Sequence, residues 1–296
     1  MSLLTRPTVL RVGRIHFLNT LPFFYSWKVT GAGDGIRFVN GSPQEINEKM
    51  SKGEMEIGLT SSLAYALYPE RLLVLPGLCI GAYRRSKSVT LYSREPIETL
   101  NGKKIALSAK SLSASALLRI LLALRWRFQN EFEISHASPE LMLQQHRSCL
   151  LIGDEALFFR PQDVFSYDLS EMWWEWTGFP FCFALWTVRK SFYERFPAQV
   201  ERVYEILSGG LTRNLEHLEK LVDGTELPPG QGPVVLEYLK SLEYRLTDKV
   251  QEGLHLFFRY AQKIGLVPEA QPLEFCPVSL SRDFTSEGGE RRHETG

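Results

Sequence analysis

Hydrophobic residues in the first seventy positions change their spacing several times, which indicates that strands and helices alternate. Residues 9–17 place β-branched and aromatic side chains in close succession, as strands do. The stretch 42–53 has Ser42 as a helix N-cap, Glu45 three residues later and Gly53 as a stop signal. The predicted elements are a strand over 9–17, a helix from Pro22, a strand over 36–41, a helix over 42–53, a strand over 56–62 and a short helix after it.

The alternation continues to about residue 191 and then gives way to helices. Residues 113–126 have the amphipathic pattern of a strong helix, and the apolar run 181–191 is expected to cross back to the first sheet. From about residue 192 the apolar positions recur at helical spacing. The further strands are predicted over 72–82, 88–94, 103–111, 132–138 and 149–157.

This order of elements predicts an α/β fold made of two lobes. Strands that alternate with helices are typical of a largely parallel sheet covered by helices. We expect lobe one to comprise residues 1–93 and 190–280, with lobe two, residues 94–189, inserted into it. The polar, glycine-rich tail 281–296 is expected to be disordered. Two crossing strands would form a hinge, and the cleft between the lobes would be the ligand site.

Composition and sequence pattern argue against nucleic-acid, membrane and metal partners. Lys+Arg and Asp+Glu both number 34, so no excess of positive charge supports a nucleic-acid partner. No stretch approaches the ~20 apolar residues of a membrane span, and no signal-peptide pattern opens the chain, so we expect a cytoplasmic protein without a membrane partner. The cysteines form no CxxC pair, which predicts buried thiols in a reducing compartment and no metal site. They are Cys79, Cys149, Cys182 and Cys276.

Small polar residues gather where four of the predicted strands end. They are Asn19 with Thr20, residues 60–62, residues 108–115, and residues 153–155. Ligands of open α/β sheets bind at the carboxyl ends of the strands, and a helix N-terminus with serine hydroxyls holds an anion well. Two such helix starts suggest a ligand with two anionic groups. The alternative is plain N-capping, for which serine and threonine are preferred in any protein.

Common catalytic motifs are missing from the chain. There is no GxGxxG after a strand, no GxxxxGK[ST], no HExxH and no GxSxG, so nucleotide binding, zinc hydrolysis and a nucleophile elbow have no support. The aromatic stretch 173–181 could stack on a ligand. We expect it to pack beneath the chain crossover instead, with Thr177 and Gly178 forming a turn.

Five blocks of the sequence resemble, in register, those of the chorismate dehydratases, which begin the futalosine route to menaquinone. The opening block matches the pattern G-x-I-x-[YF]-L-N-T-x-P of that family, and the blocks together cover about residues 10–192. The blocks are GRIHFLNTLPFFYSW, GSPQEINEKMSKGEMEIGLTSSLAYALYPERLLVLPGLCIG, GKKIALSAKSLSASALLRILL, LLIGDEAL and DLSEMWWEWTGFPFCFALWTVRKS.

The resemblance implies a type II periplasmic-binding-protein fold and a cofactor-free lyase. Its substrate would be chorismate, a small molecule with two carboxylates, dehydrated to 3-[(1-carboxyvinyl)oxy]benzoate. The alternative is a non-catalytic binding protein for a small dicarboxylate in the same cleft. Asn19 is the expected catalytic residue, and the base is either Asp154 or the substrate's own side-chain carboxylate. The residues expected to bind the substrate are Thr20, Ser61, Ser62, Ser88, Ser111, Ser113, Ala114 and Asp154.

One turn departs from the family pattern. Where the family has Gly-Pro-x-Gly-Ser-Val, this chain keeps Ser88 and Val89 but has lost both glycines. Three cations, Arg84, Arg85 and Lys87, stand there instead. Either the turn binds an anion in a different way or the substrate is altered, unless the cations only form a solvated loop, which is our expectation.

Overall fold

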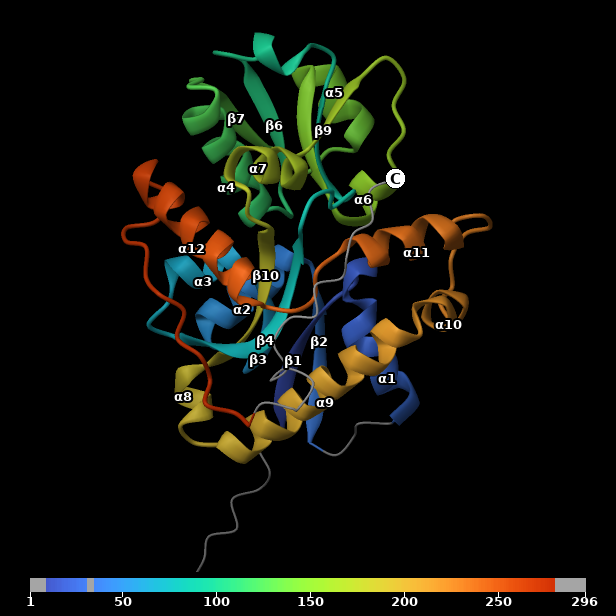
Figure 1. The fold of residues 1–296 in the computed structure, drawn as a ribbon, viewed down its shortest axis with the longest axis vertical. Coiled ribbons are helices and arrows are strands. Elements are labelled where there is room, and N and C mark those ends of the chain that lie inside the picture. Colours follow the sequence, from blue (N-terminus) through green and yellow to red (C-terminus); the bar gives the residue numbers. More distant parts are fainter. Residues whose placement is uncertain (1–8, 31–34, 280–296) are drawn as a thin grey trace, which may run out of the picture.

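Two β-sheets form the two lobes of the molecule, one above the other in Figure 1. The computed structural model describes residues 9–30 and 35–279, so the predicted tail 281–296 lies outside the described residues. The first sheet has the order β2-β1-β3-β10-β4. Its strands are β1 Leu10–Ile15, β2 Ile36–Gly41, β3 Ile57–Ser61, β4 Leu72–Ala82 and β10 Phe181–Arg189.

The second sheet has the order β7-β6-β8-β5-β9. In both sheets three adjacent strands run parallel. In the first sheet β10 pairs antiparallel with β3 and β4, and in the second sheet β5 pairs antiparallel with β8 and β9. Strands β5 and β10 are those next to the points at which the chain crosses between the sheets. The strands are β5 Val89–Ser93, β6 Lys104–Ser108, β7 Glu131–Ser135, β8 Ser148–Ile152 and β9 Phe165–Asp168.

Helices cover both sheets. Those of the first lobe are α1 Leu21–Thr30, α2 Pro43–Lys52, α3 Ser62–Leu67, α8 Lys190–Tyr193, α9 Pro197–Glu216, α10 Leu218–Asp223, α11 Gly232–Ser241 and α12 Asp248–Lys263, with the 3-10 turn η1 Leu18–Thr20. Those of the second lobe are α4 Ser113–Ile120, α5 Pro139–His146, α6 Gly153–Phe158 and α7 Leu169–Thr177, with the turn η2 Ile97–Thr99 and the π-helical turn η3 Leu121–Arg125. None of the helices in the described part of the chain is both long and apolar enough to span a bilayer.

The structure confirms the predicted α/β class and departs from some element predictions. The predicted capping box at Ser42 and Glu45 is formed, and Gly53 ends α2 in the left-handed conformation. The predicted strand 149–157 is wrong in its second half, because Gly153 (φ +62°) turns the chain into α6. Helices α5 and α7 have no counterpart among the predicted elements.

The chain changes sheets at positions other than 93/94 and 189/190. Strand β5 already belongs to the second sheet, and β10 already belongs to the first. The physical reason is pairing: β10 is one long apolar strand that buries itself between β3 and β4, so it cannot also serve the second sheet. The division into two discontinuous units stays a prediction.

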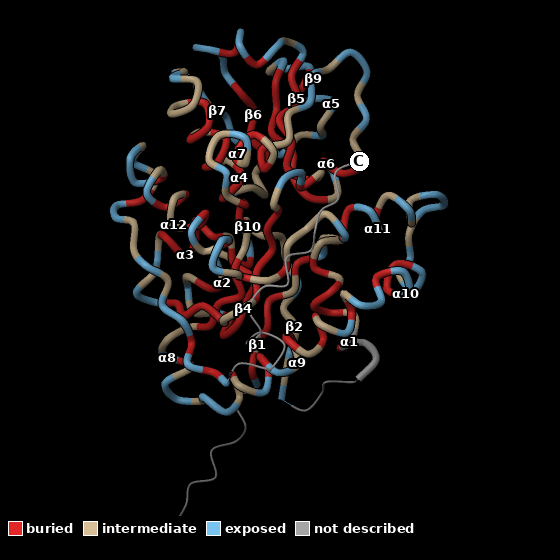
Figure 2. The backbone as a smooth tube through the Cα atoms, viewed as in Figure 1, coloured by how far each residue is buried: buried red, intermediate tan, exposed pale blue. Residues whose placement is uncertain are grey.

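A continuous hydrophobic core joins the lobes. Figure 2 shows buried backbone along the strands of both sheets. Trp186 of β10 is completely buried against Phe23 and Phe24 of α1. Trp173 of α7 is equally buried and packs edge-on against Phe181 and other rings, which fits the expectation that the aromatic stretch packs beneath the crossover.

Candidate active site

Four polar strand ends meet where the lobes adjoin, two from each sheet. In the first lobe η1 follows β1 and α3 follows β3, and in the second lobe α4 follows β6 and α6 follows β8. The Leu18 N–H donates to Asp154 Oδ1 over 3.1 Å, which ties η1 to α6. The hydroxyls of Ser62 and Ser113 lie 3.0 Å apart, which ties α3 to α4. The strand ends selected from the sequence therefore face each other in two pairs.

Asn19 occupies the middle of η1 and is half-buried. Its Oδ1 atom is enclosed and accepts no hydrogen bond from the described part of the chain. The same side chain lies close enough to the hydroxyl of Tyr238 on α11 to influence its pKa. A buried amide oxygen without a donor is costly and is usually paired by a water or a ligand. This oxygen is therefore the clearest unpaired acceptor at the junction.

The neighbouring Thr20 has a different role. Its hydroxyl is buried, lies 2.8 Å from the Ile15 carbonyl and 2.9 Å from the Phe17 carbonyl, and has no proton to spare for a ligand. Because these bonds close the turn after β1, Thr20 fixes the backbone that carries Asn19.

Ser61 and Ser62 also bond mainly to the protein. The Ser61 hydroxyl caps α3 by accepting from the Ala64 N–H over 3.3 Å, and Asn47 bonds to both the Ser61 hydroxyl and its N–H. The Ser62 hydroxyl donates to the Cys182 carbonyl over 2.8 Å. These contacts agree with capping and packing roles, the alternative that the sequence left open.

In α4 the three predicted residues divide in the same way. Ser111 accepts from the Ser115 N–H over 3.1 Å and so caps the helix start. Ser113 is buried and accepts the Leu63 N–H over 3.1 Å from the other lobe. Ala114 is buried beside it. The helix starts therefore hold the lobes together through serine hydroxyls.

Ser88 lies directly before β5 and is 3% exposed. Its hydroxyl oxygen accepts a hydrogen bond from Tyr238 over 2.9 Å, and its carbonyl accepts the Gly153 N–H over 2.8 Å. Ser88 thus sits between α11 of the first lobe and the start of α6. This places it beside the helix that carries Asp154.

Asp154 is the one predicted site residue that titrates. Burial raises the pKa of this carboxyl to about 6, although the hydrogen bond from the Leu18 N–H and the charge of Lys110 act in the opposite direction. A carboxylic acid with a pKa near 6 can take up or release a proton close to neutral pH. Asp154 can therefore act in acid–base chemistry as well as hold η1.

Glycine is required at position 153 for two reasons. Its φ of +62° lies in the left-handed region, and a Cβ atom there would lie 2.9 Å from the Phe17 ring of the other lobe. The close approach of Phe17 brings β1 and α6 together on either side of Asn19.

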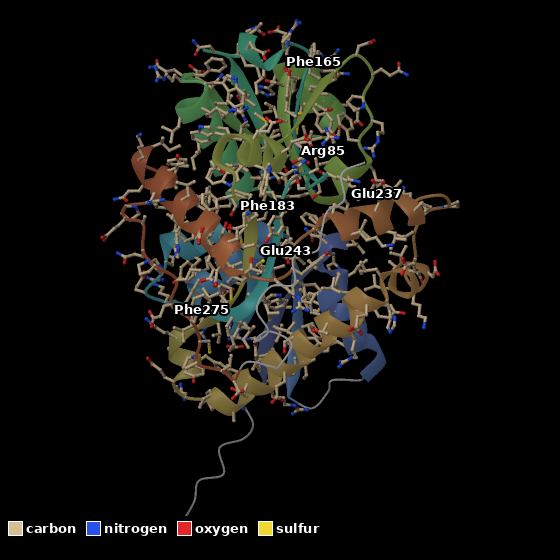
Figure 3. All side chains as sticks on the ribbon, in the orientation of Figure 1. Arg85, Phe165, Phe183, Glu237, Glu243 and Phe275 are labelled. Atoms are coloured by element: carbon tan, nitrogen blue, oxygen red, sulfur yellow. The ribbon has the colours of Figure 1, made fainter. Side chains whose placement is uncertain are left out.

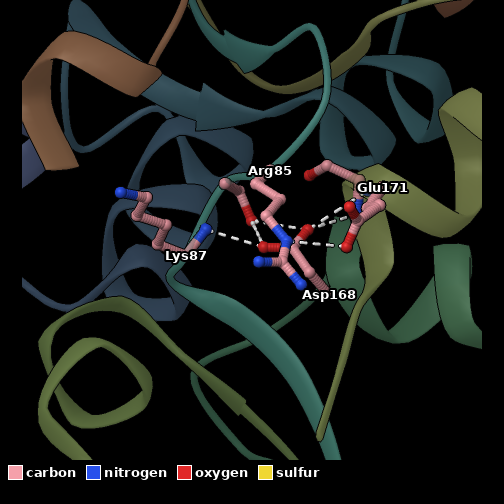
Figure 4. A network of polar contacts seen from close by, with 6 residues as sticks. Arg85, Lys87, Asp168 and Glu171 are labelled. Carbon is pink, nitrogen blue, oxygen red and sulfur yellow. Dashed lines mark hydrogen bonds and ion pairs between the residues drawn. The ribbon is translucent and has the colours of Figure 1, made fainter. Parts of the chain in front are cut away.

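The cations of the divergent turn are paired within the protein. Arg85 Nε donates to Glu171 over 2.7 Å (Figure 4), and Lys87 pairs across the lobes with Glu237 of α11, which is labelled with Arg85 in Figure 3. Arg84 lies over the Trp174 ring, 5.9 Å from its centroid. These partners fit a surface loop better than a set of free cations that close on a ligand.

The buried carboxylate of Asp168 fixes the conformation of the turn that carries these cations. Asp168 accepts the Lys87 N–H over 2.7 Å and the Ser170 N–H over 2.9 Å, and the Ser86 hydroxyl lies within 3.3 Å of it (Figure 4). Lys87 has a φ of +60°, a conformation that few residues other than glycine adopt. The carboxylate thus holds a turn that glycines form in the resembling family.

Sequence reasoning missed Tyr238 and Asn47. Both stand in amphipathic helices, where nothing in their spacing distinguishes them from ordinary core or surface positions. Only the tertiary fold brings them to Ser88 and Ser61. No group of three His, Cys, Asp or Glu side chains within residues 9–30 and 35–279 is arranged to hold a metal ion.

Two α/β lobes joined by two crossings, with polar strand ends facing one another, define a fold of the periplasmic-binding-protein type. The fold is similar to that of AF1704 from Archaeoglobus fulgidus (TM-score 0.65, 19% identity, 87% of this chain and 98% of that chain). It is also similar to the periplasmic aliphatic sulphonate binding protein SsuA from Escherichia coli (TM-score 0.63, 16% identity, 90% and 96%). At these identities the likeness concerns the fold alone.

The sequence places the chain more narrowly. The family model described as menaquinone biosynthesis matches residues 10–263, and the chain belongs to this family. A chorismate dehydratase from Thermus thermophilus is 28% identical over an alignment of 281 residues that covers 88% of this chain and 96% of that protein. The resemblance seen in the five sequence blocks is thereby confirmed.

Proposed function

We propose that this protein is a chorismate dehydratase, a carbon–oxygen lyase that forms 3-[(1-carboxyvinyl)oxy]benzoate for menaquinone biosynthesis by the futalosine route. The observation that carries the proposal is the similarity to a chorismate dehydratase along 88% of the chain, together with membership of the menaquinone biosynthesis family. The unpaired amide oxygen of Asn19, in the motif that opens the resemblance, supports placing the chemistry at the lobe junction.

The reaction removes the 4-hydroxyl of chorismate and the proton on C3, and the ring becomes aromatic. The carbon oxidation level summed over the molecule does not change, so the step needs no redox cofactor. Loss of the C3 proton moves negative charge onto the ring carboxylate. An enzyme accelerates such a step with donors and dipoles that are fixed where this charge develops.

Only some residues at the junction are suited to hold the departing hydroxyl, bind a carboxylate or take up the C3 proton. Asn19 offers an amide that can hold the departing hydroxyl, and Ser88 has a buried hydroxyl with a proton left for a carboxylate. Asp154, with its pKa of about 6, or the enolpyruvyl carboxylate of the substrate takes the C3 proton. Thr20, Ser61, Ser62, Ser111 and Ser113 support these groups by fixing the turns and helix starts around them.

A cytoplasmic location is part of the proposal. All four cysteines, Cys79, Cys149, Cys182 and Cys276, are buried free thiols. Unpaired cysteines are typical of proteins that work in a reducing compartment.

The alternative function is a non-catalytic receptor for a small dicarboxylate, which the likeness to sulphonate-binding proteins favours. Incubation of the purified protein with chorismate, followed by mass spectrometry, separates the two. A lyase yields the aromatic product that has lost one water. A receptor retains unchanged chorismate in equilibrium dialysis and yields none of that product.

A further inference from the structure

Tyr238 connects the two lobes behind the candidate residues. It stands on α11, in the first lobe, and its side chain is completely buried. Its hydroxyl donates a hydrogen bond to Ser88 Oγ, at the start of the second lobe, over 2.9 Å. The side chain of Asn19 on η1 also lies close to this hydroxyl and influences its pKa. One phenol therefore links two candidate site residues that come from different sheets.

These contacts fix which atom of each partner remains for a ligand. A tyrosine hydroxyl has one proton, and here Ser88 receives it, so the phenol oxygen can offer the nearby Asn19 only an acceptor, which suits the amide N–H. The Asn19 Oδ1 atom then points elsewhere and has no donor within the described residues. Ser88 Oγ, already an acceptor, keeps its own proton free. Asn19 thus presents an acceptor to a ligand, and Ser88 presents a donor.

Burial keeps the phenol in the protonated form that this arrangement needs. Desolvation raises the pKa of Tyr238, and the nearby Asp154 carboxylate raises it further. The hydroxyl consequently stays neutral at and around neutral pH, and it remains the donor to Ser88 there.

We propose that Tyr238 is a positioning residue that orients the Asn19 amide and the Ser88 hydroxyl toward the substrate. The inference rests on the proposed function and names a residue that the sequence did not select. Tyr238 itself touches no reacting atom. Its removal leaves both polar groups in place but free to turn, so it lowers the rate of the chemical step more than it weakens substrate binding.

The test is the Tyr238→Phe variant, which removes only the hydroxyl. We expect kcat for chorismate to fall about tenfold to a hundredfold, while KM changes far less, because misorientation by about an ångström costs up to ~10² in rate. The matched control is Tyr204→Phe on α9, since Tyr204 has a buried hydroxyl that bonds to nothing in residues 9–30 and 35–279. That control should keep the kcat of the wild type.

A second variant covers the case in which Tyr238→Phe does not fold. Ser88→Ala removes the same bond from the other lobe and should lower kcat, and in the double variant the two losses should be less than multiplicative. Equal kcat values for Tyr238→Phe and Tyr204→Phe, or fully multiplicative losses, would overturn the positioning role. A wild type that does not convert chorismate would instead overturn the proposed function, and the inference with it.

Discussion

At the residue scale, the central feature is a buried amide oxygen that the protein leaves without a donor in its described part. The Asn19→Ala variant removes this oxygen but leaves Thr20 to close the turn. We predict a fall in turnover of at least ~10²–10³, the usual cost of losing one fixed polar group in an active site. Chorismate consumption measured by absorbance tests this, with circular dichroism to show that the variant is folded.

A matched control for that variant is Asn101→Ala. Asn101 is exposed, precedes the end of β6 opposite to the one that leads to the junction, and accepts the Gln129 N–H over 3.0 Å. This control should retain wild-type turnover. If Asn19→Ala is as active as Asn101→Ala, Asn19 has no catalytic role.

The pKa of Asp154 gives a prediction about stability. The folded-state value of about 6 lies above the ordinary value of 3.8, so the native state binds more protons between these pH values. The contribution of this group to the unfolding free energy is therefore present below about pH 4 and is lost as the pH rises through about 6, by at most about 3 kcal/mol. In the Asp154→Asn variant this part of the pH dependence should disappear.

Urea denaturation of both proteins at pH 4 and pH 7 measures the difference. The amide oxygen that this substitution introduces can still accept the Leu18 N–H, so the variant keeps the contact between η1 and α6. Glu155→Gln on the same helix is the control, because Glu155 is exposed, and it should keep the slope of the wild type. An unchanged slope in Asp154→Asn would contradict the burial argument.

Residue roles were only partly predictable from the sequence. Asn19 and Asp154 stand out because small polar residues follow apolar strands, and that signal is local, whereas Ser88 was selected by the family resemblance alone. Thr20, Ser61 and Ser62 carry the same signal, yet their hydroxyls bond to the backbone or to neighbouring side chains. The distinction depends on neighbours that are distant in sequence, such as Tyr238, and these only the fold supplies.

At the element scale, the start of α6 decides how closely the lobes approach. Gly153→Ala would impose a left-handed φ on alanine and drive its Cβ into the Phe17 ring. Gly102→Ala is the matched control, because Gly102 has a φ of +73° with no atom within 4 Å of the added Cβ. We predict that the control loses about 1–2 kcal/mol of stability from strain alone, and that Gly153→Ala loses more.

Thermal denaturation of the two glycine variants compares these costs, and KM for chorismate reports on the junction. The KM should rise in Gly153→Ala and stay unchanged in Gly102→Ala, since only the first displaces Phe17. Equal stability losses with equal KM values would show that the Phe17 contact does not matter.

The elements themselves were predictable where local signals agree. The capping box at Ser42, the strand ends and the amphipathic α12 follow from spacing that the structure confirms. The stretch 149–157 was predicted as one strand because apolar residues stand at both of its ends, yet the strand ends at Ile152 and the left-handed Gly153 turns the chain into α6.

At the scale of the whole molecule, the two lobes are held by a few polar bridges around a shared core. The Lys87–Glu237 pair crosses the lobes near the surface, whereas Arg85 pairs with Glu171 within the second lobe. Exposed ion pairs contribute ~0–1 kcal/mol, and 1 kcal/mol corresponds to about fivefold in affinity. Replacing Arg84 and Arg85 by alanine should therefore change KM for chorismate by less than about fivefold.

Steady-state kinetics at low and moderate salt check this prediction. A rise in KM well beyond that bound that disappears with added salt would show that these cations attract the substrate.

The two-lobed class followed from the order of elements, whereas the points at which the chain changes sheets did not. Pairing of β5 and β10 fixes those points, and strand pairing is a long-range property that no local pattern encodes.

The most direct test of the proposed function is a time course with chorismate in large molar excess over the wild-type protein, followed by mass spectrometry. We predict that 3-[(1-carboxyvinyl)oxy]benzoate accumulates to many molecules per molecule of protein and that chorismate is consumed at the same rate. Chorismate that persists unchanged, or that is only bound in an amount equal to the protein, would contradict the proposal.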